Sequence, residues 1–570
     1  MIAKYFRMFA SAVTAVSLTL AVPGGVWAQP KSSGPANFKT ETPIKHVVVI
    51  FQENISFDHY FATYPNAANP PGEPAFHALA GTPTVNNLLS GGLIDSNPNS
   101  TQPFRLDRTQ PVTCDQNHNY APEQTAFDKG LMDGFPAATG TGNGTVSATT
   151  PPITGQTVGS PLLPGQSGYC FDAEKGKGLV MGYYDGNTVT ALWNYAQHYA
   201  MSDNSFSTTF GPSSVGAINL ISGNTFEATM VPTKPNGAAS SPSGLIAGDA
   251  TSGALIGDAR PAFDDCVNTN PQLQTTNQAQ MTGNNVGNLL GNKDITWGWF
   301  AGGFAPTNGT TLPAVCGSAH TGLAGNGLVA EPDNVTTVGD YIPHHEPFEF
   351  YSDTTNQHHL RPSSPSLIGY DDVANHQYDL TDFFTALTNG NLPAVSYLKA
   401  NAYQDGHAGY SDPLDEQTFL VSTINQIMAS PDWATTAIII AYDDSDGWYD
   451  HQMDPVINQS SVADDALTGP GACGTTPLDA IPGRCGYGPR QPLLVISPYA
   501  KANYVDHVIT DQSSILAFIE YNWELGSVGG ASNDVKAGSL LGMFDFSKTP
   551  DAASRALLLN ESTGEVVKLN

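Results

Sequence analysis

Short runs of apolar, β-branched residues alternate along the chain with segments of helical periodicity. Residues 46–51 (HVVVIF) and 437–442 (AIIIAY) are continuous apolar runs, which is typical of strands buried on both faces. Shorter runs predict further strands at 295–300, 394–398 and 493–497. Helical patterns occupy residues 188–199, 381–388, 415–429 and 513–525. This alternation predicts an α/β fold with a mostly parallel central sheet and helices on both faces.

Three long, mostly polar segments interrupt the alternation, at about 137–168, 231–292 and 302–339. We interpret them as excursions from one core that form a lid, because none of them resembles a linker between separate domains. The sequence therefore predicts a single domain over residues 29–570.

The first 28 residues have the pattern of a signal peptide. Lys4 and Arg7 precede a short apolar stretch, and Ala28 ends a small-x-small site. A membrane anchor is the alternative, but the stretch is short for a membrane span and Pro23 interrupts it. We expect an exported protein, periplasmic or secreted, without a stable membrane anchor.

The six cysteines fit an exported protein with disulfides. Six cysteines allow many connectivities, and the sequence does not choose among them. Nearest-neighbour pairing would close three loop-rich segments, at Cys114–Cys170, Cys266–Cys316 and Cys473–Cys485.

The balance of 22 basic against 52 acidic residues gives a net charge of −30. Such a chain repels nucleic acids and anionic membranes over long range, which excludes nucleic-acid binding as a function class. Hydrophobic residues make up 40%, enough for a large core. An anionic substrate must then be captured locally, by a metal ion, a protonated histidine or a helix N-terminus.

Oxygen-bearing side chains follow the two apolar runs directly. Glu53 and Asn54 come after the first, and Asp443 and Asp444 after the second. The carboxyl ends of parallel strands meet at one edge of a sheet, where such oxygens would hold a divalent cation of the hard Ca or Mg type. The alternative is that residues 443–447 form an ordinary turn with solvated carboxylates.

Ser213 stands at the expected start of an apolar helix, beside Pro212. A helix N-terminus offers free N–H groups and a positive dipole end, which would bind a phosphate. An ordinary helix cap is the alternative. The segment also lies one residue away from a G-x-S-x-G nucleophile elbow, because Val215 replaces the second glycine. A metal-free serine esterase therefore remains a further alternative.

Four histidines occur in polar segments flanked by Gly or Pro, namely His118, His344, His345 and His407. Loop histidines can donate hydrogen bonds to a phosphoryl group or protonate a leaving oxygen, in which case activity should favour acid pH. A purely structural role is the alternative. The chain has no P-loop, no H-E-x-x-H and no G-x-G-x-x-G after a strand, so nucleotide binding and zinc-protease activity have no support.

The chain resembles the bacterial phospholipase C / acid phosphatase A family of exported phosphoesterases. The resemblance rests on seven segments in family order, at 46–61, 117–135, 206–223, 344–351, 403–417, 441–451 and 486–507. It implies an alkaline-phosphatase-like α/β fold with one divalent metal ion. Positions that match the family's metal site are Glu53, Asn54, Asp443 and Asp444, with Ser213 as nucleophile and metal ligand. Positions that match its phosphate pocket are His118, His344, His345 and His407.

Two positions favour the acid-phosphatase branch of that family. Phospholipase members commonly carry Thr where Ser213 stands, and Asp-Glu where Asp443-Asp444 stand. The resemblance thus implies hydrolysis of small phosphomonoesters through a seryl-phosphate intermediate. Cleavage of phospholipid headgroups by a phospholipase C is the alternative within the family, and a non-catalytic exported binding protein is an alternative outside it. The sequence does not indicate the oligomeric state.

Overall fold

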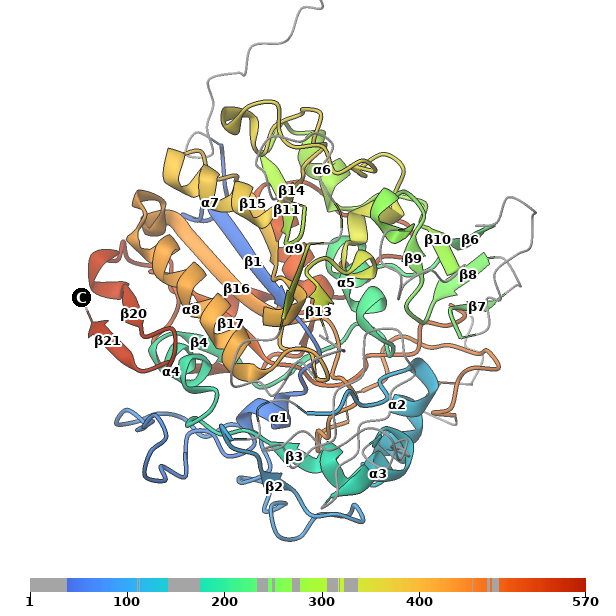
Figure 1. Ribbon diagram of the computed structural model, residues 1–570, viewed down its shortest axis with the longest axis vertical. Coiled ribbons are helices and arrows are strands. Elements are labelled where there is room, and N and C mark those ends of the chain that lie inside the picture. Colours follow the sequence, from blue (N-terminus) through green and yellow to red (C-terminus); the bar gives the residue numbers. More distant parts are fainter. Residues whose placement is uncertain are drawn as a thin grey trace, which may run out of the picture. The chain divides into compact units, whose positions relative to one another are not determined.

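In the computed structural model, the two longest apolar runs form adjacent central strands (Figure 1). β1 (His46–Gln52) and β16 (Thr436–Tyr442) pair in parallel over their whole length, with Gln52 opposite Tyr442. Every residue of both strands is buried, as expected for strands covered on both faces. The residues that follow the two strands therefore emerge at the same edge of the sheet.

The structure describes residues 38–109, 111, 113–141, 175–232, 244–248, 252–268, 277–304, 316, 318–321, 337–453, 455–468, 472–473 and 481–569. The expected signal peptide over residues 1–28 lies outside this part of the chain, as does most of the expected insert at 137–168.

The central sheet has eight strands in the order β14-β11-β15-β1-β16-β17-β4-β18. Its other six strands are β4 (Ala200–Ser202), β11 (Trp297–Ala301), β14 (Gln377–Asp379), β15 (Val395–Lys399), β17 (Leu493–Ile496) and β18 (Tyr504–Asp506). Strand β17 runs antiparallel to both of its neighbours, and every other pairing in the sheet is parallel. The expectation of a mostly parallel sheet is confirmed, and β17 ends at the edge opposite to the ends of β1 and β16.

The predicted helices form between the strands and cover both faces of the sheet. They are α4 (Thr190–His198), α5 (Ser213–Ser222), α7 (Leu380–Asn389), α8 (Pro413–Ala429) and α9 (Gln512–Asn522). Helix α4 contacts α8, and α5 contacts α9. Helix α8 begins where Asp412 accepts hydrogen bonds from two free backbone N–H groups, at 2.8 and 2.9 Å. Helix α7 ends at Gly390, whose φ of 70° suits glycine.

The second expected insert contains a sheet that the hydrophobic pattern did not predict. Its strand order is β7-β8-β6-β10-β9. The strands are β6 (Ala228–Pro232), β7 (Ile246–Gly248), β8 (Ser252–Leu255), β9 (Arg260–Pro261) and β10 (Asn277–Gln280). Strands of two to five residues are too short to show a clear alternation of polar and apolar positions.

The remaining elements are short. The helices are α1 (Phe57–Phe61), α2 (Tyr120–Phe127), α3 (Phe135–Ala138) and α6 (Val286–Gly291). Strand pairs join β2 (Phe104–Arg105) to β3 (Gly182–Tyr183), β5 (Ser205–Phe206) to β19 (Thr510–Asp511), β12 (Ala319–Thr321) to β13 (Thr337–Gly339), and β20 (Leu557–Leu559) to β21 (Val566–Leu569).

The disulfides follow the nearest-neighbour order where they are described. Cys266 pairs with Cys316, and Cys473 with Cys485. Cys114 is also disulfide-bonded, and its expected partner, Cys170, lies outside the described residues.

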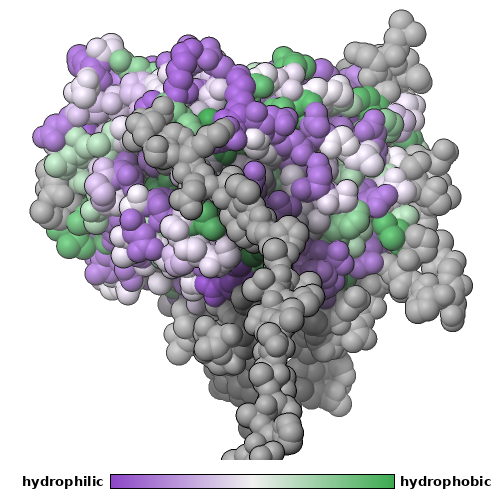
Figure 2. Space-filling model, turned by 90° about the horizontal axis from the view of Figure 1, so that it is seen from above, coloured by the Kyte–Doolittle hydropathy of each residue, from purple (hydrophilic) through white to green (hydrophobic). Residues whose placement is uncertain are grey.

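Within the described ranges, no helix combines the length and the hydrophobicity that crossing a membrane would require. On the face shown in Figure 2, hydrophobic residues are scattered among hydrophilic ones.

Candidate active site

Ser213 meets two carboxylates at the edge of the sheet where β1 and β16 end. It is the first residue of α5, after the N-cap Pro212, and is 1% exposed. Its Oγ lies 3.0 Å from Glu53 Oε2 and 3.1 Å from Asp444 Oδ2. The hydroxyl therefore sits at the positive end of a helix, against acceptors that can take its proton. The structure brings together the serine and the strand-end carboxylates that the sequence predicted separately.

The side-chain amide oxygen of Asn54 lies among the same carboxylates. Its φ of 64° is left-handed, a conformation that asparagine tolerates better than most residues. Its backbone N–H donates to Asp443 Oδ1 at 2.9 Å, and its Nδ2 donates to Asp446 Oδ1 at 3.3 Å. Its Oδ1 is buried and accepts no hydrogen bond from the described residues. A buried acceptor without a donor, surrounded by carboxylates, is suited to a cation.

Backbone N–H groups hold one oxygen of each aspartate and leave the other turned to the site. Asp443 Oδ1 accepts from the N–H of Asp444 at 2.7 Å, and Asp444 Oδ1 accepts from the N–H of Asp446 at 2.7 Å. Asp443 Oδ2 is buried and receives no hydrogen bond within the described chain. Asp443 and Asp444 are 1% and 0% exposed, which rules out a turn of solvated carboxylates. The predicted ligand set thus fits a hard divalent cation, and it consists of Glu53, Asn54, Ser213, Asp443 and Asp444.

Helix α5 approaches the loop after β16 so closely that only glycine fits at the contact. A Cβ added to Gly216 would lie 2.0 Å from the carbonyl oxygen of Asp443. Ser213 is one helical turn away on the same helix, so this contact fixes the distance between the serine and the carboxylates.

We expect Gly216→Ala to lower both stability and activity, because the methyl group must push α5 away from the carboxylate loop. Overpacking of this kind costs about 1–3 kcal/mol of unfolding free energy. Gly291→Ala is the matched control, since Gly291 is also helical and an added Cβ meets nothing within 4 Å. Urea unfolding and steady-state kinetics of both variants test this, and equal behaviour of the two would contradict it.

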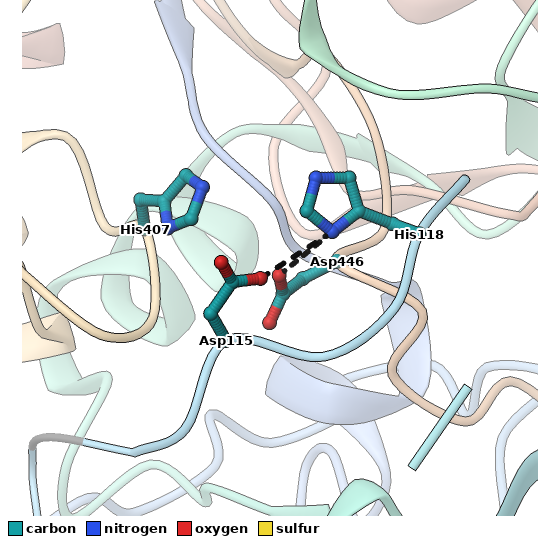
Figure 3. A group of neighbouring side chains, drawn as sticks. All are labelled: Asp115, His118, His407 and Asp446. Carbon is teal, nitrogen blue, oxygen red and sulfur yellow. Dashed lines mark ion pairs between the residues drawn. The ribbon is translucent and has the colours of Figure 1, made fainter. Parts of the chain in front are cut away.

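His118 and His407 lie beside the carboxylate site, together with two further aspartates (Figure 3). His118 Nδ1 is 3.1 Å from Asp446 Oδ1 and 3.6 Å from Asp115 Oδ1. The rings of His118 and His407 are 6.0 Å apart between centroids. His407 Nδ1 bonds the carbonyl oxygen of Ala408 at 2.5 Å. The four side chains come from three loops, which a sequence pattern alone cannot bring together.

His344 and His345 occupy one short 3₁₀ turn, Pro343–His345. Their rings are 4.4 Å apart, and His345 Nδ1 lies 3.1 Å from Glu53 Oε1. The structure therefore places His345 directly against a predicted metal ligand.

The surroundings shift the pKa values of the four histidines in different directions. Burial lowers the pKa of His118, but the charges of Asp444 and Asp446 outweigh it and raise that pKa well above its usual value. Burial and the charge of Arg260 lower the pKa of His344 to about 3. Burial likewise lowers the pKa of His345, strongly, and the pKa of His407. The neighbouring carboxylates thus favour the charged form of His118, and burial favours the neutral form of the other three.

Sequence reasoning missed Lys399, the last residue of β15. Lys399 is 3% exposed, and its Nζ contacts Glu53 Oε1 and lies 3.8 Å from Asp443 Oδ2. A buried lysine is rare unless it is paired. The signal was available, because Lys399 directly follows the predicted strand at 394–398 at the same edge of the sheet.

The fold and site together define an α/β protein with a buried serine, a group of buried oxygen-bearing side chains and a cluster of histidines at the carboxyl ends of its parallel strands. The chain belongs to the Phosphoesterase family, which matches residues 44–526. This match confirms the resemblance that the sequence motifs indicated.

Curated relatives include bacterial phospholipases C. Phospholipase C A of Mycobacterium tuberculosis is 24% identical over 93% of this chain and 82% of its own length. The non-hemolytic phospholipases C of Pseudomonas aeruginosa and Burkholderia pseudomallei are 30% and 34% identical. Each of these two matches covers 23% of this chain, and the chain spans only 20% and 19% of their lengths.

Among solved structures, similarity extends to a Vibrio parahaemolyticus protein in the alkaline phosphatase superfamily. The two chains are 12% identical, with coverage of 67% of this chain and 69% of the other and a TM-score of 0.27.

Proposed function

We propose that the protein is an exported, metal-dependent phosphoesterase that hydrolyses phosphomonoesters through a seryl-phosphate intermediate. The observation that carries the proposal is the position of Ser213 Oγ at a helix N-terminus, within 3.1 Å of both Glu53 and Asp444. A serine that served only as a helix cap would bond backbone N–H groups of its own helix, and no such bond forms here.

The residues that would hold the cation are Glu53, Asn54, Ser213, Asp443 and Asp444. Their all-oxygen donor set suits a hard cation of the Ca or Mg class. When bound, the ion supplies Lewis-acid chemistry: it lowers the pKa of the serine and offsets negative charge on the phosphoryl group.

The chain's own groups then account for each proton. Ser213 Oγ attacks phosphorus as its proton passes to Asp444, and the bond from phosphorus to the alcohol oxygen breaks. His118, the charged histidine, donates a proton to that leaving oxygen. Water then attacks the seryl phosphate and loses a proton to His118, which the first step left neutral. The bond from phosphorus to Oγ breaks as Asp444 returns its proton to Ser213, and phosphate leaves.

Neutral His344 can donate its ring N–H to a phosphoryl oxygen. His345 and His407 place Nδ1 against Glu53 and the Ala408 carbonyl, so each would bind a phosphoryl oxygen through Nε2 only when protonated.

We also propose one phosphoesterase domain over residues 29–570, behind a signal peptide at 1–28. The insert at 231–292 supports the lid assignment, because Asp258 accepts from the N–H of Ser214 at 3.0 Å and from its hydroxyl at 2.9 Å. The insert thus contacts the residue next to the nucleophile.

A phospholipase C is the second candidate, because the curated relatives carry that name. The phosphatase assignment rests on Ser213 and on the Asp443-Asp444 pair, which differ from the phospholipase pattern. The two candidates are separated by turnover of p-nitrophenyl phosphate near pH 6 and of phosphatidylcholine in mixed micelles. Faster release of phosphate from the small ester supports the phosphatase. Faster release of diacylglycerol supports the phospholipase.

We predict that replacing Lys399 strengthens metal binding and weakens substrate binding. In Lys399→Met the carboxylates lose a buried positive charge, so the metal-free protein should bind Mg²⁺ or Ca²⁺ about tenfold more tightly. The KM for p-nitrophenyl phosphate should rise at saturating metal, because the site now repels the phosphate dianion. Lys399→Arg, which keeps the charge, should change both values less.

Metal titration by calorimetry and steady-state kinetics measure the two effects of Lys399→Met. A merely structural lysine would instead weaken metal binding and leave KM unchanged, and that result would contradict the prediction.

A further inference from the structure

A second concave site lies at the end of the central sheet that is opposite to Ser213. It is a cavity of about 510 Å³, formed by the segment after β17 and by residues near the C-terminus. Because β17 is antiparallel to β16, the segment that follows it starts at the edge opposite to the carboxylate site. The backbone joins the two walls, since the N–H of Asp545 donates to the carbonyl of Tyr499 at 2.8 Å.

Three cations line this cavity, namely Lys501, Lys548 and Arg555. The Arg555 guanidinium is half-buried and donates to the carbonyls of Ala500 at 2.9 Å and His198 at 3.3 Å. Lys501 Nζ donates to the carbonyl of Gly542 at 2.6 Å. Among the described residues, none of the three cations forms an ion pair with a carboxylate.

This concentration of positive charge is unusual in a chain of net charge −30 with only 22 basic residues. One carboxylate, Asp545, also lines the cavity, and it accepts hydrogen bonds from the N–H and hydroxyl of Ser547 at 3.0 and 2.5 Å. These bonds lower the pKa of Asp545, and the charges of Lys548 and Lys501 lower it further, so Asp545 offsets part of the charge of the two lysines. Burial lowers the pKa of Arg555, and no carboxylate is among the groups that raise it. A partly buried, uncompensated cation is costly, and a bound anion would offset that cost.

We propose that this cavity binds the phosphate or pyrophosphate group of a soluble small molecule, at a site separate from the catalytic centre. Arg555 offers a planar fork and the two lysines offer point charges, a combination that suits phosphate oxygens. Tyr499 and Tyr504 also line the cavity and provide walls for an organic part of the ligand. The volume lies within the range of about 300–1,000 Å³ that is usual for small-molecule sites.

The test is calorimetric titration of inorganic pyrophosphate into the full chain carrying Ser213→Ala, which prevents turnover, with metal supplied. We expect that adding Lys501→Met and Lys548→Met abolishes one binding event or weakens it at least tenfold. Adding Lys129→Met and Lys536→Met, a charge-matched pair elsewhere on the surface, should leave that event within twofold. The proposal would be overturned if the two double-lysine variants bound pyrophosphate equally well, or if both lost the binding event to the same extent.

A single exposed substitution, Lys548→Glu, gives a readout that does not depend on the partly buried Lys501, and it too should weaken the pyrophosphate-binding event.

Flotation with phosphatidylcholine vesicles containing phosphatidic acid distinguishes the ligand's source. We expect no capture of the protein. Capture that needs Lys501 and Lys548, without pyrophosphate binding, would overturn the assignment to a soluble ligand.

Discussion

Ser213→Ala should lose about 10³-fold or more in kcat on p-nitrophenyl phosphate, with correct folding and metal binding largely kept. Removing a covalent nucleophile costs at least this much, because the remaining groups can only position a water molecule. The hydroxyl lies within 3.1 Å of two carboxylates and has no other partner among the described residues, so no neighbouring group can replace it.

Ser222→Ala is the matched control for the nucleophile. Ser222 is the last residue of the same helix, and its hydroxyl bonds the carbonyl of Ile218 at 2.9 Å. This variant should retain its activity. Ser213→Thr keeps a hydroxyl and should lose much less than Ser213→Ala. Equal activity of Ser213→Ala and wild type would mean that the serine is only a cap and that the nucleophile lies elsewhere.

Removal of divalent metal by a chelator should abolish turnover, and adding Mg²⁺ or Ca²⁺ should restore it. The buried oxygens of Asn54 and Asp443 accept no hydrogen bond within the described chain, and the Lys399 ammonium comes no closer to Asp443 than 3.8 Å, so a divalent cation would supply the missing contacts. Asp443→Asn should require much more metal for half-maximal activity, because it removes one ligand charge at nearly constant shape.

Asp372→Asn is the control for that substitution, since Asp372 accepts hydrogen bonds from Ser363 on the exposed surface. A metal-free serine esterase would survive the chelator and would react with fluorophosphonates. Full activity in excess chelator would therefore contradict the metal-dependent mechanism.

Local patterns were enough to select the residues that the structure brings together around Ser213. Glu53 and Asp444 follow continuous apolar strands, and strand direction alone places them together. Ser213 begins a helix at a proline, which is also a local signal. These three residues needed no long-range contact to be proposed as candidates.

Other features depend on tertiary contacts that no local pattern carries. The pairing of His118 with Asp446 joins loops that are more than 300 residues apart. The close approach of Gly216 to the β16 loop is invisible in a short apolar helix. The antiparallel direction of β17 depends on the path of the chain before it, because an apolar run has no inherent direction.

The central claim is that phosphate becomes covalently attached to Ser213 during turnover. The most direct test is rapid acid quenching of the enzyme with ³²P-labelled phosphate ester near pH 6, followed by mapping of the labelled peptide. The account predicts a labelled peptide that contains Ser213, with no label in Ser213→Ala and full label in Ser222→Ala. An active wild-type enzyme that never becomes labelled, or one labelled at another residue, would contradict it.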